Sequence, residues 1–359
     1  MSAISRRKLL LGAAAAAPAL LSGTANTQER RKVTFTLPWV AEGSNGYVFV
    51  AKAKGYWDEL GLDVVVSRGY GSVAAAQAVG AGQFQFGVAA ASAGIQQAAK
   101  GLPVVAIGCA GYDGTMGICV LKDSPIKSPK DLAGKKLAST IGSGEYPFLP
   151  LFFQRAGLDI KSVEVEAVDP NVRTRLLVSS QVDAISGFAI SIIPPLSTQK
   201  IDTRSMLFSQ YGMTLYNNTL MTQLSTLRNE PKLCADVTSG LMQAVKFTML
   251  NPDEAVKLFL KQVPETALTP SGPGQTRMGL GIFNVSMLHD PLKHGVGYTA
   301  PEDYQTMTDL VMKYIASPGD TPPRLSELFS NDLIGKVQLT PDEWSAADAK
   351  AEPFRKFLS

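Results

Sequence analysis

Residues 33–67 read VTFTLPWVAEGSNGYVFVAKAKGYWDELGLDVVVS, and this stretch decides the fold class of the chain. The apolar segment Val33–Leu37 predicts a strand, and a helix is expected from about Ser44. Two glycines then lead into a second predicted strand, Leu62–Ser67. Two strands joined by a helix of this length form a βαβ unit, so we expect a parallel sheet.

A ligand site is expected at the carboxyl end of the first strand. In parallel sheets, ligands bind beyond the carboxyl ends of the strands, where helix N-termini direct their N–H groups outward. Trp39 follows the first strand directly, and Ser44 and Asn45 lie in the polar loop before the helix. These three residues are therefore predicted to contact a ligand.

The alternation of strands and helices continues beyond residue 67. Helices are expected over 71–82 and 92–100, and strands over 83–88 and 103–109. Further along, we expect a strand over 181–185, helices over 231–250 and 252–262, and a loop with some helix over 264–281. Short joints marked by Gly between such elements indicate a doubly wound α/β layer. Ser92 begins one of these helices and is predicted to lie at the ligand site, although a serine that only caps the helix would look the same.

A second lobe is expected to begin near residue 120. Ser128, Pro129 and Asp131 occupy the N-cap, N1 and N3 positions of a short predicted helix, and a strand follows it. The start signals of this helix are structural, so they predict fold and carry no information about a ligand.

The second lobe contains a glycine-rich turn, IGSGEY, at residues 141–146. A Gly-Ser-Gly turn before a helix exposes N–H groups that can receive a carbonyl or an oxyanion. The turn therefore predicts further site residues, namely Ser143, Gly144, Glu145 and Tyr146. The carboxylate of Glu145 would repel an anionic ligand placed beside it.

Several phrases of the sequence resemble solute-binding proteins of the NMT1/THI5-like group, the sulfonate, taurine and thiamin-precursor receptors of ABC importers. In that group a Trp follows the first strand, as Trp39 does here, and a KGYF-like phrase ends the first helix, as KGYWDELGL does at 54–62. SPIKSPKDLAGKKLA at 124–138 is similar to the opening of the second lobe in these receptors. AGQFQFGVAAAS at 81–92 and QVDAISGF at 181–188 resemble family segments that reach the cleft.

The resemblance implies an α/β fold of the two-lobed periplasmic-binding-protein clamshell type (type II-like), with a mainly parallel sheet flanked by helices in each lobe. Lobe 1 is expected to comprise residues 33–121 and 221–359, with the C-terminal helices packed on it. Lobe 2 is expected to comprise residues 122–220. The segment Tyr211–Gln223 resembles the one that returns through the hinge in the family.

Two departures from the family bear on the ligand. Thiamin-precursor binders carry a loop of the form W-x-P-N-x-x-H, whereas Ala41 stands here at the Pro position and Asn45 at the His position. The cytosolic pyrimidine synthases of the family consume an active-site His and carry a Cys-rich iron motif, and this chain has neither. These departures weigh against pyrimidine binding and against synthase activity.

The first 25 residues resemble an export signal. Arg6 and Arg7 precede the apolar run Leu9–Leu21, and small residues up to Ala25 follow it. Thirteen apolar residues are too few to span a membrane, which takes about 20. The adjacent arginines are similar to the twin-arginine signal for folded proteins, with an ordinary secretory signal as the alternative. We expect cleavage near Ala25 and a periplasmic mature protein.

Charge and reactive residues narrow the range of functions. Removing residues 1–25 takes away three cations and no acid, so the formal net charge of +3 falls to zero. A neutral protein has no electrostatic reason to bind nucleic acid or a membrane. The three Cys and two His show no metal or triad spacing, so no metal, cofactor or hydrolytic site is expected. A bridge between Cys109 and Cys119 stays open.

The predicted ligand is a small aromatic or heterocyclic compound with both donor and acceptor groups. Aromatic side chains suit a flat body, while the carboxylates and the N–H groups at 44–45 and 143–144 supply polar contacts. A sulfonate or carboxylate held by Arg173 is the alternative; Arg173 and Arg175 are otherwise expected to be solvated. The predicted site residues are Trp39, Ser44, Asn45, Ser92, Tyr112, Asp113, Ser143, Gly144, Glu145, Tyr146, Phe188 and Tyr216.

We expect a monomeric periplasmic receptor without enzyme activity, which delivers its ligand to an ABC permease after two lobes close about a hinge. Two alternatives remain. One is an exported sensor that presents its closed form to a membrane kinase, and the other is an exported enzyme on the same scaffold. The scarcity of His argues against the enzyme, whereas the sequence does not separate the receptor from the sensor.

Overall fold

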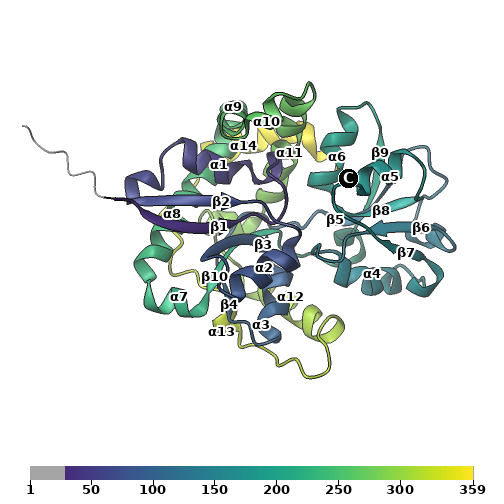
Figure 1. The fold of residues 1–359 in the computed structure, drawn as a ribbon, viewed down its shortest axis with the longest axis horizontal. Coiled ribbons are helices and arrows are strands. Elements are labelled where there is room, and N and C mark those ends of the chain that lie inside the picture. Colours follow the sequence, from purple (N-terminus) through teal and green to yellow (C-terminus); the bar gives the residue numbers. More distant parts are fainter. Residues whose placement is uncertain (1–28, 359) are drawn as a thin grey trace, which may run out of the picture.

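The computed structural model describes residues 29–358, which form two five-stranded sheets (Figure 1). The first has the strand order β2-β1-β3-β10-β4 and the second the order β7-β6-β8-β5-β9. The first sheet consists of β1 (Arg31–Thr36), β2 (Leu62–Ser67), β3 (Phe86–Ala90), β4 (Val104–Cys109) and β10 (Asn218–Gln223). The second consists of β5 (Met116–Leu121), β6 (Lys136–Ser139), β7 (Glu164–Ala167), β8 (Ala184–Phe188) and β9 (Thr203–Leu207).

Both sheets use the same pattern of strand directions. In the first sheet β1 is parallel to β2 and β3, whereas β10 is antiparallel to its neighbours β3 and β4. In the second sheet β6 is parallel to β7 and β8, whereas β5 is antiparallel to β8 and β9. Each sheet is therefore mixed, with one reversed strand. The expected α/β class with two helix-flanked sheets is confirmed.

The strand pairing places the crossings between the lobes earlier in the chain than expected. The expected boundary after residue 121 assigns β5 to lobe 1, but β5 pairs with β8 and β9 and belongs to the second sheet. Residues 218–220, expected in lobe 2, begin β10 of the first sheet. The chain thus crosses between β4 and β5, and again between β9 and β10. The expected signal, residues 1–25, lies outside the described part of the chain.

The helices cover both sheets and extend the first lobe. The first sheet carries α1 (Gly46–Ala53), α2 (Ser72–Gly80) and α3 (Ala91–Ala99), and the second carries α4 (Leu149–Arg155), α5 (Arg173–Val178) and α6 (Ala189–Ser197). The later helices gather on the first lobe in Figure 1, namely α7 (Leu224–Asn229), α8 (Pro231–Leu250), α9 (Pro252–Gln262), α10 (Pro264–Ala267), α11 (Gly272–Met287), α12 (Pro301–Tyr314), α13 (Leu325–Leu328) and α14 (Pro341–Arg355).

Helix α11 departs from the expectation, because residues 264–281 are rich in Pro and Gly and read as a loop with some helix. Pro273 stands in the first turn of α11, where proline is compatible with a helix. The helix packs against α9, α14 and α6, and most of its second half is buried. Burial of this kind outweighs low helix propensity, because tertiary packing supplies most helical stability in proteins.

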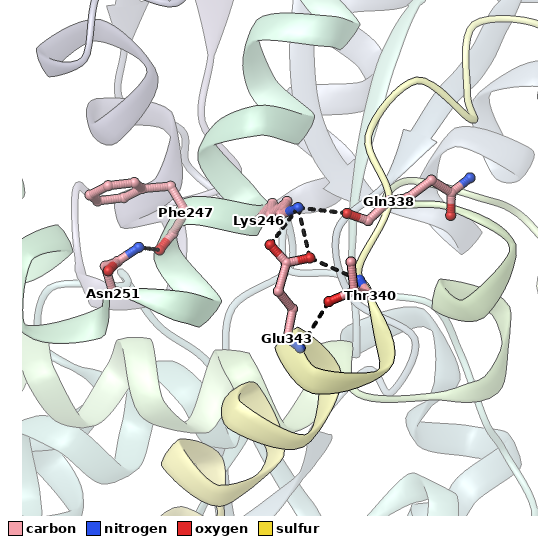
Figure 2. A network of polar contacts seen from close by, with 6 residues as sticks. All are labelled: Lys246, Phe247, Asn251, Gln338, Thr340 and Glu343. Atoms are coloured by element: carbon pink, nitrogen blue, oxygen red, sulfur yellow. Dashed lines mark hydrogen bonds and ion pairs between the residues drawn. The ribbon is translucent and has the colours of Figure 1, made fainter.

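The last helix, α14, is attached to α8 by the polar network drawn in Figure 2. Lys246 of α8 donates to the carbonyl of Gln338 at 2.8 Å and to Oε2 of Glu343 at 2.9 Å. Thr340 and Glu343 form a capping box, in which the Thr340 N–H donates to Glu343 at 2.8 Å and the Glu343 N–H donates to Thr340 at 3.2 Å. The hydrogen bond from Lys246 is the main reason that the pKa of Glu343 is lowered.

An apolar cluster joins the two lobes beside this helix. Ala189, Ile190 and Ile193 of α6 and Leu207 of β9 form a buried cluster with Ile282 of α11. Side chains near the end of the chain, including Phe354 and Phe357, pack against the same cluster. In Figure 1 the end of α14 correspondingly lies next to α6.

The three cysteines are buried thiols. Cys109 and Cys119 lie in β4 and β5, which belong to different sheets, and Cys234 lies in α8. The bridge left open by the sequence is therefore not formed. Within residues 29–358, no helix has the length and apolar character needed to cross a membrane.

Candidate functional site

A small cavity lies between the two lobes and is lined by both of them. Its volume is about 30 Å³, so the side chains of its walls nearly fill it. We call it the interlobe cavity, lined by Pro38, Trp39, Glu42, Ser44, Asn45, Gly71, Ser72, Ser143, Arg173, Phe188, Ile190, Ser191, Asn217 and Asn218. It borders an outer hollow of about 280 Å³, which shares five of these residues: Trp39, Glu42, Arg173, Ile190 and Ser191.

The lobes are in direct contact around this cavity. The Val73 N–H of α2 donates to the carbonyl of Gly142 in the second lobe at 3.1 Å. At Gly71 the approach is so close that a Cβ would lie 2.0 Å from the Gly142 oxygen, and its φ of +125° also favours glycine. On another side, Ser191 of α6 donates a hydrogen bond to Glu42 of the first lobe. The structure therefore presents the lobes closed on the cavity.

The two crossings between the lobes run side by side behind the cavity. The Asn217 N–H donates to the Gly111 carbonyl at 2.8 Å, and the Ala110 N–H donates to the Asn218 carbonyl at 2.7 Å. Two adjacent connecting segments of this kind form the natural place for a hinge, because a few residues between rigid lobes can absorb a rotation. Asn217 and Asn218 extend from this hinge into the cavity wall.

The loop from Trp39 to Asn45 is held by its own polar side chains. Asn45 accepts from the Glu42 N–H at 3.1 Å and donates to the Val40 carbonyl at 2.8 Å. Ser44 donates to Oε1 of Glu42 at 2.6 Å, and Asn218 donates to the Ser44 carbonyl at 3.2 Å. This network fixes the carboxylate of Glu42 at the cavity wall. Burial raises the pKa of Glu42 despite the opposing effects of Ser191, Ser44 and the Arg173 charge.

On the second lobe, a buried carboxylate lies behind the cavity. Glu145 is fully buried. It accepts hydrogen bonds from the hydroxyl of Ser143 and, at 3.0 Å, from the hydroxyl of Ser186. The hydroxyls of Ser186 and Ser139 share a further hydrogen bond of 2.5 Å. Oε1 of Glu145 lies 3.9 Å from Nη1 of Arg173. The ion pair is nearly removed from water, since its side chains are 0% and 4% exposed.

Arg173 reaches the cavity through space that a neighbouring glycine leaves open. A Cβ on Gly187 would lie 2.7 Å from Nη1 of Arg173. The guanidinium lies over the Trp39 ring of the other lobe, 5.3 Å from its centroid, within the range of a cation–π contact. Burial lowers the pKa of Arg173, while Glu145 and Glu42 oppose that shift.

Two buried donors in the cavity wall have no partner among residues 29–358. These are Nε of Arg173 and Nδ2 of Asn217, and the two side chains belong to residues that are 3% and 2% exposed. Buried polar groups in proteins almost always have a hydrogen-bond partner. These two donors therefore lack the partner that buried polar groups usually have.

The structure brings together some of the predicted site residues and separates others. Those that line the interlobe cavity are Trp39, Ser44, Asn45, Ser143 and Phe188. Gly144 and Glu145 are buried behind the wall, and Tyr146 and Ser92 lie outside the set of lining residues.

Three further predicted residues lie near the hinge and do not line the interlobe cavity. Tyr112 and Tyr216 pack edge to face, with ring centroids 5.1 Å apart, and line a separate hollow that also contains His289 and His294. The Tyr216 hydroxyl donates to Asp303 at 2.5 Å. Its ring is therefore held by contacts within the core and not by the cleft. Asp113 accepts from the Thr115 N–H at 3.1 Å and caps the hinge segment.

The expected free N–H groups are partly used by the protein itself. The Ser143 N–H donates to the Thr140 carbonyl at 2.9 Å, and the Asn45 N–H donates to the Glu42 carbonyl at 3.1 Å. The Asn45 bond belongs to the 3₁₀ turn Gly43–Asn45 before α1, and the Ser143 bond closes the turn that precedes the 3₁₀ turn Tyr146–Phe148. Polar groups at the cavity therefore come mainly from side chains, whereas the sequence predicts that they come from backbone N–H groups.

Arg173 is the main residue that sequence reasoning misplaces. Both arginines of α5 are expected in solvent, yet Arg173 is buried at the cavity, while Arg175 is exposed. Ser72, Ser191 and Asn218 are further wall residues that the sequence does not indicate. The one usable signal is the glycine at 187, which stands opposite Arg173 in a strand that is otherwise built from larger residues.

Histidine, cysteine and clustered metal-binding side chains are absent from the cavity wall in the part of the chain that is described. Across residues 29–358, no three His, Cys, Asp or Glu side chains come together in a way that could hold a metal ion.

The sequence model of the NMT1/THI5-like family matches residues 45–255, which include most of the cavity wall. The chain belongs to the NMT1/THI5-like family. This confirms the family expected from the sequence, and the match covers the hinge, the second sheet and all strands of the first sheet except β1.

Some curated relatives of this NMT1/THI5-like chain carry names from thiamin metabolism, and others are named as putative binding proteins of Brucella species. A putative thiamine biosynthesis protein of Haemophilus influenzae is 27% identical over 242 residues, which is 67% of this chain and 76% of that protein. A 4-amino-5-hydroxymethyl-2-methylpyrimidine phosphate synthase of Legionella pneumophila is 22% identical over 246 residues, or 66% of this chain and 75% of the synthase. The named relatives thus include an enzyme.

Among solved structures, this NMT1/THI5-like protein is similar to the periplasmic aliphatic sulphonate binding protein SsuA of Escherichia coli, with a TM-score of 0.62. The alignment covers 87% of this chain and 94% of SsuA at 15% identity. At this identity the similarity shows a shared fold, which is the two-lobed architecture of a periplasmic binding protein.

Proposed function

We propose that this protein is the substrate-binding component of an ABC import system, and that it captures a small aromatic or heterocyclic ligand between its lobes by hinge closure. The observation that supports this most is the interlobe cavity, whose walls come from both lobes and from the hinge. A ligand that contacts both walls binds the closed form better than the open form, so it shifts the balance toward closure.

The character of the walls supports the ligand class. Trp39 and Phe188 offer aromatic surface from opposite lobes, while Arg173, Asn217 and Glu42 offer directed polar groups. Pockets with a few polar groups among apolar and aromatic side chains are typical of small-molecule sites. A flat ring with polar substituents uses both kinds of contact.

We further propose that the protein is exported to the periplasm, acts as a monomer and hands its ligand to a permease in the inner membrane. Support comes from the N-terminal sequence pattern and from the similarity of fold to a periplasmic binding protein. Neighbouring genes for a permease and an ATPase would favour the importer over a sensor that signals to a membrane kinase.

A thermal-shift screen of the purified mature protein tests the proposal. A ligand at 100 times its dissociation constant stabilises the folded state by about 2.7 kcal/mol, which raises the melting temperature by a few degrees. We expect aromatic or heterocyclic compounds to give such shifts, and Trp39→Ala to weaken them. Stabilisation by aliphatic compounds alone, undiminished in Trp39→Ala, would contradict the proposed ligand class.

An enzyme on the same scaffold is the second candidate, because a relative bears the name of a pyrimidine phosphate synthase. Both histidines of the chain line the hollow behind the hinge instead of the interlobe cavity. Product formation from a ligand found in the screen, monitored at steady state, would revive the enzyme; binding without turnover favours the receptor.

A further inference from the structure

We propose that the interlobe cavity selects ligands without a net negative charge, binding an acceptor atom of the ligand through Arg173 and Asn217 and a donor group through Glu42. This inference rests on the proposed function, because it concerns the ligand of the same cavity. It adds two properties of that ligand, namely its charge and the presence of a hydrogen-bond acceptor next to a donor. A cyclic amide, a sulfonamide and an amino-substituted ring nitrogen are examples of groups with such a pair.

The charge balance of the cavity carries the first part of the inference. Among its lining residues, Arg173 supplies the positive charge and Glu42 a carboxylate, and Glu145 directly behind the wall supplies a second carboxylate. One cation therefore faces two acids. An anion entering this space would leave buried negative charge uncompensated, and burying unpaired charge is strongly unfavourable.

The geometry of Arg173 supports the same conclusion. One side of its guanidinium, Nη1, is directed to Glu145 at 3.9 Å, in the space that Gly187 leaves open. The Nε edge has no partner within residues 29–358. The arginine is thus already charge-compensated by a protein carboxylate and still offers a hydrogen bond. It can hold a neutral acceptor without needing an anionic one.

The remaining polar groups define a complementary edge on the ligand. Nδ2 of Asn217 is a second unpartnered buried donor of the cavity wall, so two donors call for an acceptor atom. Glu42 is the acceptor of the wall, and its Oε1 accepts from Ser44 and Ser191. A carboxylate has several lone pairs, so in its ionised form Glu42 can accept a further hydrogen bond from a ligand N–H or O–H.

A matched pair of probes separates charge from shape. Benzenesulfonate and benzenesulfonamide have nearly the same size, but only the sulfonate is an anion at neutral pH. For the wild-type protein, we expect calorimetric titration to give a dissociation constant for benzenesulfonate above about 1 mM. Glu42→Gln should tighten benzenesulfonate by about tenfold or more, since a like charge near the anion is removed.

A second variant and a control sharpen the test. Glu42→Gln/Glu145→Gln should tighten benzenesulfonate further, to roughly a hundredfold over wild type, because both opposing carboxylates are gone. Glu254→Gln removes the same charge from the exposed face of α9 and should leave sulfonate binding unchanged. If the double variant does not fold, Glu42→Gln alone decides, since its carboxylate lies at the cavity wall and not in the core.

Two results would overturn the charge assignment. One is tighter binding of benzenesulfonate than of benzenesulfonamide by the wild-type protein, and the other is no gain of sulfonate binding in Glu42→Gln. Either result would leave the receptor function standing if a ligand still closes the lobes. Absence of any closing ligand would instead count against the proposed function itself.

Discussion

Glu42 of the first lobe accepts a hydrogen bond from the hydroxyl of Ser191 in the second lobe, so the two walls of the interlobe cavity are joined at this point. The same carboxylate oxygen also accepts from Ser44 at 2.6 Å within its own loop. Opening of the lobes would break the first bond and keep the second. The carboxylate is therefore held in place in both states but gains an interlobe partner only on closure.

Ser191→Ala should shift the protein toward the open form. A hydrogen bond to a charged group contributes about 1.5–3 kcal/mol, which corresponds to a change of roughly tenfold or more in the balance. Small-angle scattering should then show a larger radius of gyration than in wild type. Ser197→Ala, near the other end of α6, is the matched control and should scatter like wild type.

Closure should depend on pH through Glu42. Burial in the closed arrangement raises its pKa above the ordinary value of 4.5, in spite of the lowering effects of Arg173, Ser191 and Ser44. The closed form thus takes up a proton more readily, so closure is most favourable below pH 4.5 and weakens as the pH rises through the raised value. The radius of gyration should increase over that range, and Glu42→Gln should remove this component. A profile identical in wild type and variant would contradict the assignment.

Gly187→Ala should displace Arg173 from the cavity. The new methyl group would lie 2.7 Å from Nη1 and 2.8 Å from the side chain of Ile192, so the surroundings must move. Overpacking of this kind costs about 1–3 kcal/mol, and ligand binding should weaken as the guanidinium shifts. Gly46→Ala is the control, since its Cβ meets only Phe259 at 3.6 Å. Unchanged stability and affinity in Gly187→Ala would refute the close packing.

Thr340→Ala should destabilise the first lobe modestly by removing the N-cap of α14. The substitution loses the hydrogen bond from the Glu343 N–H, and such caps are worth about 1 kcal/mol. Urea unfolding should show a lower midpoint with an unchanged slope. Lys246→Ala, which removes the half-buried ion pair of the same network, should cost less, because ion pairs in contact with solvent contribute about 0–1 kcal/mol.

Export should depend on the paired arginines near the N-terminus. Replacing Arg6 and Arg7 together by Lys should leave the precursor in the cytoplasm, if the twin-arginine pathway carries the chain. Cell fractionation followed by N-terminal sequencing should place the mature start of the wild type near Asn26. Normal export of the double variant would point to an ordinary secretory signal and leave the periplasmic location intact.

The sequence predicted elements well where local signals were strong. Strand Leu62–Ser67 and helices Pro231–Leu250 and Pro252–Gln262 are found at their expected bounds, because glycine or proline marks their ends. The strand expected at 181–185 begins later, as β8 at Ala184, because pairing with β5 and β6 sets its register. Strand pairing of this kind depends on residues far away in the chain.

The site was harder to predict, for the same reason. Trp39 and Ser143 stand next to strand ends and could be placed by local pattern. Arg173 looks like any solvated residue of a short helix, and its burial depends on Glu145, Gly187 and the Trp39 ring of the other lobe. A contact between two lobes leaves no periodic trace in either segment, so such residues emerge only from the assembled fold.

The position of β10 in the first sheet imposes an order on the completion of this protein as it leaves the ribosome. Strand β4 has β10 as its neighbour in the sheet, and residues 218–223 are made only after the whole of the second sheet, whose strands lie within residues 116–207. The second lobe is thus the first unit with a full set of strands. The first lobe must remain incomplete, with β4 unpaired, until β10 is made. An unpaired strand edge favours aggregation and misfolding. A pathway that exports proteins only after folding would spare the chain from crossing the membrane in that incomplete state.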